Sequence, residues 1–309
     1  MPYAVQNLAV VKPRVLLLGS GGQLGMLLAR VLADDCELTS YSRAQLDFTD
    51  EAALRKAVQD AQPDIIVNAA AYTAVDKAES EKELAHAVNA VAPGILGEEL
   101  RAVNPDGWFV HYSTDYVFDG SGTEPWREGD PTGPLSVYGQ TKLDGEQAIA
   151  ATGCQHLILR TSWVYAAEGR NFLHTMLRLG RDRERLSIVD DQIGAPTSAE
   201  CIAEATSKLV AQLVSTSSEA SGIYHLTCAG ATSWFGFARA IFQAFAAQQK
   251  PPQLSPIPTE AYPTPARRPH NSRLNCDKLT AQFGIRLPYW EEALDHVAAQ
   301  VAATMQPSK

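Results

Sequence analysis

The sequence predicts an α/β fold, with a doubly wound parallel β-sheet and a smaller, mostly C-terminal lobe. Over the first two thirds of the 309 residues, short runs rich in leucine and β-branched residues alternate with segments of helical periodicity. Such strict alternation favours parallel strands joined by right-handed crossover helices. The strand-like runs do not alternate polar and apolar residues, which indicates that helices cover both faces of the sheet.

Five strands and four helices are expected in this first part of the chain. The strands are expected at residues 14–18, 37–41, 64–68, 108–113 and 156–161. The helices are expected at residues 24–32, 51–59, 81–101 and 137–151, with a break in the third near Pro93 and Gly94.

The pattern changes after Tyr165. Helices are expected at residues 172–180, 199–213 and 233–248, a loop at 190–198, and a short strand at 222–226 that should rejoin the first sheet. The charged stretch 181–185 is most simply a solvated surface, although an arginine there could reach a diphosphate. Residues 251–269 contain seven prolines, so no regular structure is expected. They form either a plain linker or, because Arg268 and Asn271 adjoin them, a ligand-binding loop.

Composition excludes several kinds of partner. The net charge of −9 argues against nucleic acid, because phosphate binding needs concentrated lysine and arginine. The five cysteines include no Cys-x-x-Cys pair, which fits a reducing cytoplasm better than a disulfide scaffold or a zinc site. The apolar run at residues 8–11 is too short for a secretory signal, and no apolar stretch approaches the roughly 20 residues of a membrane span. We therefore expect a cytoplasmic protein without a membrane partner.

A glycine-rich segment, GSGGQLG at residues 19–25, joins the first predicted strand to the first predicted helix. Glycines at this place allow a tight turn and bring backbone N–H groups against a pyrophosphate at a helix N-terminus. The spacing differs from the general Gly-x-Gly-x-x-Gly pattern, and a purely structural turn is the alternative. The position between strand and helix favours a Rossmann-type dinucleotide site. Its expected cofactor contacts are Gly19, Gly21, Gly22, Gln23, Leu24 and Gly25.

This site divides the chain into two functional parts. The dinucleotide-binding domain is expected to comprise residues 13–167, rejoined by 198–228. Residues 168–197 and 229–309 should form a substrate-binding lobe over the carboxyl ends of the strands, where open α/β sheets bind ligands.

The end of the second predicted strand bears on the choice of cofactor. NAD-preferring sites usually place an acid there to bind the ribose hydroxyls, but this sequence has Ser42 and Arg43. Arg43 either pairs with a 2′-phosphate, which favours NADPH with NADH also accepted, or is a solvated surface arginine. Asp47, followed by Phe48, could hydrogen-bond the adenine, and the alternative is that Asp47 or Asp50 caps a helix.

Tyr138 and Lys142 stand four residues apart in a predicted helix, so the phenol and the ammonium lie on one face and can meet a common ligand. A neighbouring positive charge should lower the pKa of Tyr138 and make it a general acid for a carbonyl oxygen. This spacing alone also arises by chance. Thr114 strengthens the interpretation, because it follows the fourth predicted strand at the edge where its hydroxyl can hold that carbonyl.

Longer motifs resemble the extended short-chain dehydrogenases that act on nucleotide sugars, and most closely the dTDP-4-dehydrorhamnose reductase family. They are NAAAYTAVDKAE (68–79), HYSTDYVF (111–118), RTSWVY (160–165), DQIGAPT (191–197) and RPHNSRL (268–274). The resemblance extends from residue 14 to about residue 290. It implies NAD(P)H-dependent reduction of the C4 keto group of dTDP-4-dehydro-L-rhamnose to dTDP-L-rhamnose.

The resemblance also implies roles for particular residues. Tyr138 would donate the proton, with Lys142 as its electrostatic partner and a ribose ligand. Thr114 would hold the C4 carbonyl, with Asp115 beside it, and Trp163 would pack on the sugar or base. Further implied contacts are Arg268 and Asn271 with the substrate, and Ala71, Tyr72 and Thr73 with the cofactor.

One departure from the family concerns metal. Some members carry a glutamate early in the first helix that helps to bind a metal ion between two subunits. Leu27 stands at the matching position, and an apolar side chain cannot ligate a hard cation. We therefore expect no metal, and either a monomer or a homodimer that no metal bridges.

Two alternatives stand beside reduction by this family. The first is another epimerase or reductase acting on nucleotide sugars, although Tyr116 occupies the place where sugar dehydratases carry a glutamate base. The second is a non-catalytic NADP-binding regulatory subunit, because folds are reused without activity. The intact Thr114, Tyr138 and Lys142 count against it. His111, His156 and His225 lie in predicted strands and are expected to be packed core residues.

Overall fold

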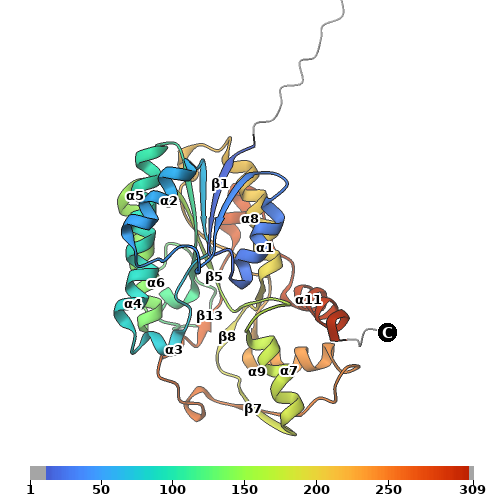
Figure 1. The fold of residues 1–309 in the computed structure, drawn as a ribbon. Helices are drawn as coiled ribbons and strands as arrows, with labels where there is room; N and C mark the ends of the chain where they lie inside the picture. Colours follow the sequence, from blue (N-terminus) through green and yellow to red (C-terminus); the bar gives the residue numbers. More distant parts are fainter. Residues whose placement is uncertain (1–11, 306–309) are drawn as a thin grey trace, which may run out of the picture.

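The computed structural model describes residues 12–305. Within these residues the centre is a parallel sheet of six strands in the order β10-β5-β4-β3-β1-β2 (Figure 1). The predicted doubly wound α/β sheet is therefore confirmed. The late strand β10 pairs with β5 and so returns the chain to this sheet.

The boundaries of the strands and of most of the helices lie close to those predicted, whereas α3 and α10 were not expected. The strands are β1 (Arg14–Leu18), β2 (Glu37–Tyr41), β3 (Ile65–Asn68), β4 (Trp108–Thr114), β5 (Gln155–Thr161) and β10 (Gly222–His225). The helices around them are α1 (Gln23–Leu32), α2 (Glu51–Ala61), α3 (Val75–Ala78), α4 (Lys82–His86), α5 (Ala92–Val103), α6 (Val137–Thr152), α8 (Ala199–Leu213) and α10 (Asp277–Phe283).

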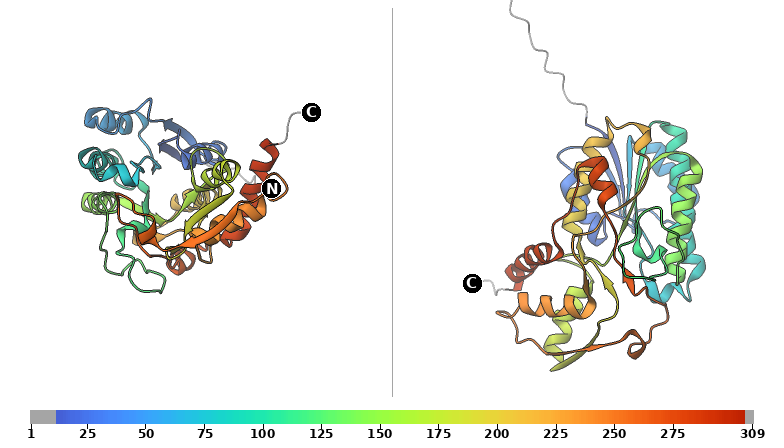
Figure 2. Two further views of the ribbon diagram at one scale, coloured as in Figure 1. Left: turned by 90° about the horizontal axis from the view of Figure 1, so that it is seen from below. Right: turned by 180° about the vertical axis from the view of Figure 1, so that it is seen from behind.

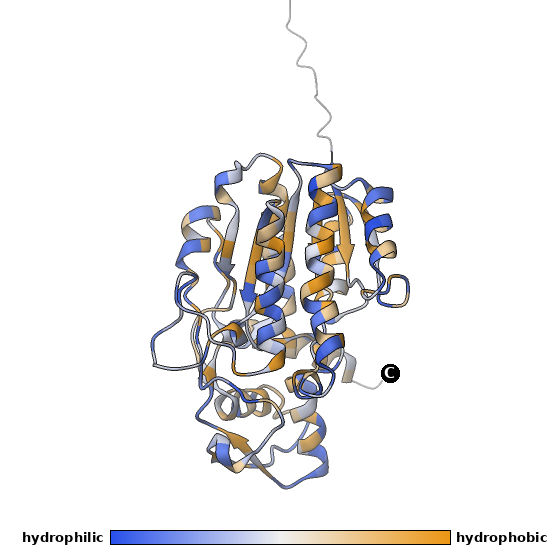
Figure 3. Ribbon diagram, turned by 90° about the vertical axis from the view of Figure 1, so that its left-hand side faces the viewer, coloured by the Kyte–Doolittle hydropathy of each residue, from blue (hydrophilic) through white to orange (hydrophobic). Residues whose placement is uncertain are grey.

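Helices cover both faces of the sheet (Figure 2). Helices α1 and α8 pack on one face, and α2, α5 and α6 pack on the other. In β1, Val15 and Leu17 enter the first core whereas Leu16 and Leu18 enter the second. Both faces of the strand are thus buried, which explains why its sequence shows no polar face. Figure 3 shows hydrophobic strands between helices that carry hydrophilic and hydrophobic residues.

The smaller lobe lies beyond the carboxyl ends of the sheet strands (Figure 1). Its helices are α7 (Phe172–Asp182), α9 (Trp234–Ala244) and α11 (Trp290–Met305). Its strands are short: β7 (Arg185–Val189) pairs with β12 (Gln253–Ile257), β8 (Ile193–Gly194) pairs with β11 (Thr232–Ser233) and β13 (Asn271–Ser272), and β6 (Val164–Tyr165) pairs with β9 (Thr197–Ser198).

Two sequence expectations fail in this lobe. Part of the proline-rich segment 251–269 is regular, because β12 forms a parallel ladder with β7. Pro256 is tolerated there because β12 has a neighbour on one side only, and an edge strand needs fewer backbone donors. The loop expected at residues 190–198 contains the short strands β8 and β9.

The third predicted helix also differs from expectation. Pro93 lies in the first turn of α5 and does not break the helix, because the preceding π-helical turn has already shifted the backbone hydrogen bonding there, with the Ala92 N–H donating to the Ala87 carbonyl. The irregularity comes earlier, as a π-helical turn at Ala87–Val91 between α4 and α5. The following prediction, a helix over residues 137–151, is confirmed by α6.

Within residues 12–305, no helix combines the length and apolar character that crossing a membrane requires. The short apolar run at residues 8–11 lies outside the described part of the chain.

Candidate active site

The glycine-rich segment forms the turn from β1 into α1. Gly19 has a φ of 84°, and a Cβ there would lie 2.6 Å from the Ala70 nitrogen. A Cβ on Gly25 would lie 2.0 Å from the Gly19 carbonyl oxygen, so only glycine fits at either position. Helix α1 begins after Gly22 without a side-chain cap. Its first N–H groups are therefore open to an anionic ligand, as a pyrophosphate site requires.

A cavity of about 460 Å³ opens over this turn. Nine of the predicted cofactor residues line it, namely Gly19, Gly21, Gly22, Ser42, Arg43, Asp47, Phe48, Ala71 and Tyr72. The structure adds apolar walls that the sequence reasoning missed, among them Leu46, Leu84 and Val88. The sequence around these three residues does not mark them as cofactor contacts, because they come together only when β2, β3 and α4 pack against one another.

Six predicted cofactor residues do not line this cavity: Gln23, Leu24, Gly25, Thr73, Tyr138 and Lys142. The Gln23 side chain accepts a hydrogen bond of 2.8 Å from Asn171 and so ties α1 to the loop before α7. Leu24 packs against the hydrophobic core. Gly25 is needed for the close approach to Gly19 described above.

The rim of the cavity carries Arg43 and Asp47, both exposed. The Asp47 carboxylate accepts hydrogen bonds of 2.8 Å from the backbone N–H and the hydroxyl of Thr49, which lower its pKa. Asp50 caps α2, through a 3.0 Å bond from the Ala53 N–H, so of the two capping candidates this is the one that caps. Asp47 is left at the cavity, where it can accept a hydrogen bond from a ligand.

Thr114, Asp115 and Tyr138 come together at the carboxyl end of β4. The Thr114 hydroxyl donates to Asp115 Oδ1 at 3.0 Å, and the Tyr138 phenol lies close enough to Thr114 and Asp115 for both to affect its pKa. The N-terminus of α6, which carries Tyr138, is held by Ser136, which accepts from the Gly139 N–H, and by Glu79, which accepts from the Val137 N–H at 2.9 Å. Local caps thus fix the tyrosine against the strand end.

The predicted lowering of the Tyr138 pKa is wrong for this structure. Burial raises its pKa to about 12, and the charge of Asp115 adds to that effect, whereas the hydrogen bond from Thr114 opposes it. Nζ of Lys142 contacts β4, and no hydrogen bond joins it to the phenol among the described residues. A phenol with a raised pKa stays protonated at neutral pH, which is the state that a proton donor needs.

Lys142 is almost fully buried and lies against β4. Its Nζ donates to the Tyr112 carbonyl oxygen at 2.6 Å and lies 3.0 Å from His111 Nε2. Burial lowers the pKa of Lys142 to about 8, and the charge of Glu146 partly opposes that effect. The expectation that His111 is only a core residue is therefore incomplete, because its ring touches the lysine of the site.

A buried ion pair supports this region, and sequence reasoning missed it. Glu146 on α6 accepts two hydrogen bonds from Arg160 on β5, at 2.9 and 2.6 Å, and a third from Ser113 at 2.5 Å. Both charged side chains are only 2% exposed. The signal that could have found the pair is Glu146 itself, which continues the face of Tyr138 and Lys142 by one further turn.

Asp115 and Trp163 are two further predicted substrate residues close to the strand ends. Burial raises the pKa of Asp115 to about 6, and its Oδ2 has no hydrogen-bond partner among the described residues. Trp163 has a φ of 50°, which is unusual for a large side chain. Its ring stacks on Trp234 with centroids 3.7 Å apart. No local pattern marks Trp234, since the pair joins distant parts of the chain.

Arg268 and Asn271 occupy different environments. The Arg268 guanidinium pairs with Asp76 at 2.8 Å and lines a second cavity of about 590 Å³ in the smaller lobe. Trp234, Arg183 and other residues complete that cavity. The Asn271 amide is engaged within the protein, since its Nδ2 donates to the carbonyls of residues 121 and 124 and its Oδ1 accepts from Arg273.

Comparison with known proteins matches this geometry to one family. The RmlD substrate binding domain matches residues 13–303. The dTDP-4-dehydrorhamnose reductase of Burkholderia thailandensis is 48% identical over 289 residues, which cover 91% of this chain and 96% of that protein. The chain belongs to the dTDP-4-dehydrorhamnose reductase family. The reductase of Escherichia coli is 44% identical over 300 residues, 94% of this chain and 98% of that protein.

Solved structures agree with the family. A dTDP-4-dehydrorhamnose reductase from Bacillus anthracis, in complex with NADP, superposes with a TM-score of 0.87 at 34% identity, and the match covers 94% of this chain and 100% of that one. A UDP-glucose 4-epimerase from Thermus thermophilus superposes with a TM-score of 0.77 at 19% identity, which shows the shared fold alone. The resemblance predicted from the motifs of this reductase family is confirmed.

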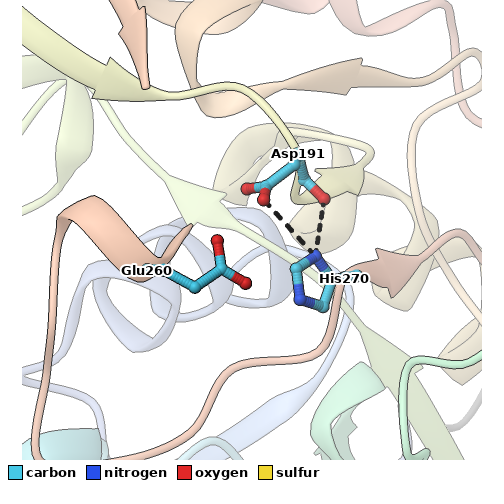
Figure 4. Close-up of side chains that lie close together, drawn as sticks. All are labelled: Asp191, Glu260 and His270. Atoms are coloured by element: carbon cyan, nitrogen blue, oxygen red, sulfur yellow. Dashed lines mark hydrogen bonds and ion pairs between the residues drawn. The ribbon is translucent and has the colours of Figure 1, made fainter. Parts of the chain in front are cut away.

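In this reductase family member, one cluster within residues 12–305 has the composition of a metal site: Asp191, Glu260 and His270 (Figure 4). The Asp191 carboxylate of this cluster already accepts three hydrogen bonds from Thr259, at 2.6 to 3.0 Å. His270 Nδ1 lies 3.0 Å from the Asp191 carbonyl oxygen. These contacts explain the cluster without an ion, and exposed acidic groups commonly gather without one, so the expectation of no metal stays a prediction.

Proposed function

We propose that this protein reduces the C4 keto group of dTDP-4-dehydro-L-rhamnose to dTDP-L-rhamnose, with NADPH as the hydride donor and NADH also accepted. The observation that carries the proposal is the meeting of Thr114 and Tyr138 at the carboxyl end of β4, in a chain whose relatives are named dTDP-4-dehydrorhamnose reductases. A hydroxyl and a protonated phenol at one point suit a carbonyl oxygen that must be held and then protonated.

The residues present fit a dinucleotide. The turn at Gly19 and Gly25 leaves no room for side chains, and the open N-terminus of α1 suits a pyrophosphate. Arg43 at the rim offers a guanidinium for a 2′-phosphate, which supports the preference for NADPH. Bound here, the cofactor supplies the hydride that reduces C4.

The protein's own part in the reaction is to hold the ketone and to deliver a proton. The Thr114 hydroxyl turns from Asp115 to the C4 oxygen, and the Tyr138 phenol donates its proton to that oxygen as negative charge develops on it. The Lys142 ammonium stabilises the tyrosinate that is left and binds the ribose. Each of these three side chains comes from β4 or α6, so the packing of one helix on one strand sets their geometry.

The remainder of the substrate would extend from this point into the smaller lobe. Oδ2 of Asp115 has no hydrogen-bond partner among the described residues, so a sugar hydroxyl that enters beside Thr114 would satisfy it. Trp163 is half-buried and stacks on Trp234, which borders the cavity of the smaller lobe. In the 590 Å³ cavity, Arg268 and Arg183 supply positive charge for a diphosphate and Trp234 supplies a ring for a base. Asn271 contributes by holding the loop at residues 121–124.

We propose further that residues 13–167 with 198–228 bind the cofactor, and that residues 168–197 with 229–309 bind the substrate. The protein is proposed to act in the cytoplasm as a monomer or as a homodimer without a bridging metal. Leu27 supports the last point, because it packs partly buried against the hydrophobic core and offers no oxygen ligand.

The decisive experiment follows NADPH oxidation by absorbance with dTDP-4-dehydro-L-rhamnose and with other 4-keto nucleotide sugars. We expect rapid oxidation with the dTDP substrate and dTDP-L-rhamnose as the product. Failure to oxidise NADPH with any of these ketones would refute the proposed function. Epimerisation of a nucleotide sugar without net oxidation would place the protein among epimerases.

The role of Tyr138 is tested by Tyr138→Phe. Turnover should fall by roughly 10²-fold or more, which is the usual contribution of general acid catalysis, while affinity for NADPH is kept. Tyr224→Phe is the matched control, because this buried phenol on β10 donates to the Ala220 carbonyl, away from Thr114. Equal turnover in the two variants would show that Tyr138 is not the donor.

A further inference from the structure

Lys142 is a buried lysine whose hydrogen bonds include no carboxylate among the described residues. Its Nζ contacts the Tyr112 carbonyl oxygen at 2.6 Å and His111 Nε2 at 3.0 Å, both on β4. The carboxylate on the same face of α6, one turn further on, is Glu146, which is engaged by Arg160 and Ser113. The imidazole of His111, which is completely buried, is therefore the side chain that determines whether Nζ of Lys142 donates or accepts a hydrogen bond.

The second nitrogen of that ring has a partner of its own. His111 Nδ1 lies 3.2 Å from Nδ2 of Asn68, and the two residues are paired across β3 and β4. The side-chain oxygen of Asn68 accepts a hydrogen bond of 3.1 Å from the backbone N–H of Ala70. Asn68 is 1% exposed, so water does not compete for either end of its amide.

These contacts fix the proton on the ring by elimination. The Ala70 N–H can only donate, so the amide of Asn68 must present its oxygen there and its NH₂ to His111. His111 Nδ1 must then accept, and a neutral imidazole with an accepting Nδ1 carries its proton on Nε2. The Nε2–H points at Lys142. An ammonium also only donates, so this pair is matched only when Lys142 is the neutral amine and accepts.

We propose that His111 is a positioning residue for the reduction: Asn68 holds it in the Nε2–H form, and it orients Nζ of Lys142 and favours the amine over the ammonium. The inference rests on the proposed function, in which the ammonium is needed beside Tyr138 and the ribose. Lys142 then takes up one proton from solvent when Nζ leaves His111 for these partners, and it returns the proton when it swings back.

Burial acts in the same direction, and the nearby charge of Glu146 acts against it. Burial lowers the pKa of Lys142 to about 8, against the charge of Glu146, and burial lowers the pKa of His111 well below its usual value. The titratable groups that face Nζ are His111 on β4 and Glu146 on α6, and Glu146 is paired with Arg160 on β5. Because the ammonium is the active form, kcat/KM should fall as pH rises through about 8.

The Asn68→Asp substitution hardly changes the shape of the side chain, but it changes which ring nitrogen of His111 must donate a hydrogen bond. A carboxylate still accepts from the Ala70 N–H but now also accepts from His111, which moves the ring proton to Nδ1 and lets Nε2 accept from an ammonium. The fall in kcat/KM should move to higher pH by at least about one unit, which corresponds to tenfold in the lysine's ionisation. In His111→Gln, the amide can present its oxygen to Lys142 without an added charge. The fall in kcat/KM should therefore also move to higher pH in this variant.

The ring proton is read directly from the histidine ¹⁵N shifts of the full chain without substrate. At pH 7 we expect His111, assigned by its absence in His111→Gln, to be neutral with the proton on Nε2. His156 is the internal control, because its Nδ1 lies 3.0 Å from the Cys154 carbonyl oxygen and must carry the proton. In Asn68→Asp, the ¹⁵N shifts of His111 should show the proton on Nδ1, as those of His156 do.

Three results would overturn the proposal: an Nδ1–H ring or an imidazolium at His111 in the unaltered protein, an unmoved ring proton in a folded Asn68→Asp variant, or an unchanged alkaline fall of kcat/KM in His111→Gln. Should Asn68→Asp not fold, the shifts of the unaltered protein and the His111→Gln profile still decide. Failure of the protein to reduce any ketone would refute the proposed function, whereas the ring spectrum is independent of substrate.

Discussion

Glu146→Gln is the perturbation whose effect can be worked most directly from the structure. The change keeps the size of the side chain and its position between Arg160 and Ser113, but it removes the negative charge. Arg160 is 2% exposed, its Nε and Nη2 donate to Glu146, and its Nη1 has no partner among the described residues. The variant therefore leaves a buried guanidinium without a counter-charge.

Removing one partner of a buried ion pair costs about 3–5 kcal/mol, because the remaining charge stays in a medium that solvates it poorly. Small proteins and domains are stable by about 5–15 kcal/mol in total, so this loss is a large share. The melting temperature should fall by roughly 6 °C or more, from about 2–4 °C per kcal/mol for chains of this order of size. Turnover should fall as well, because the pair joins the helix of Tyr138 to the sheet.

Urea unfolding followed by circular dichroism measures the free energy of unfolding. Asp60→Asn is the matched control: it neutralises one member of the Lys56–Asp60 pair on α2, whose side chains are 72% and 56% exposed, and should leave the midpoint unchanged. In Glu146→Leu combined with Arg160→Met both charges are gone, and stability should recover most of the loss. A loss below about 1 kcal/mol for Glu146→Gln, or a double variant weaker than the single one, would refute the argument from an uncompensated charge.

Three further outcomes are expected. Arg43→Ala should raise the KM for NADPH roughly tenfold or more and leave that for NADH nearly unchanged, since a hydrogen bond to a charged group contributes about 1.5–3 kcal/mol; equal effects on both cofactors would mean that Arg43 only supports the fold. Gly25→Ala, whose Cβ would lie 2.0 Å from the Gly19 carbonyl, should lower the melting temperature, whereas Gly22→Ala, at 3.4 Å, should not; similar melting of the two variants would contradict the steric argument. A chelator should change neither the mass by light scattering nor the activity, and a dimer that dissociates on its addition would show that acids other than the one replaced by Leu27 hold a bridging ion.

The regular helices and strands could be predicted because the burial of each element determines the pattern of apolar residues in its own sequence. A strand segment buried on both faces must be apolar, as β1 is from Val15 to Leu18. The glycine turn at the end of this strand marks the start of the following helix, which begins directly after Gly22. The misjudged segments are those where a distant partner overrides the local signal. Pro256 lies in a strand only because β7 pairs with that segment. Pro93 lies in a helix because the π-helical turn before it changes the backbone hydrogen bonding at the start of α5.

For the site, the sequence by itself determined the chemical groups and the edge of the sheet at which they gather. Thr114 at a strand end, and Tyr138 four residues before Lys142, follow from short-range geometry that any such chain must obey. Tertiary structure alone decided the state of those groups. It buried Tyr138 beside Asp115, which raises the phenol's pKa where a lowered one was expected, and it placed His111 against Lys142. Protonation depends on burial and on neighbours from other strands, and neither is recorded in the residues next along the chain.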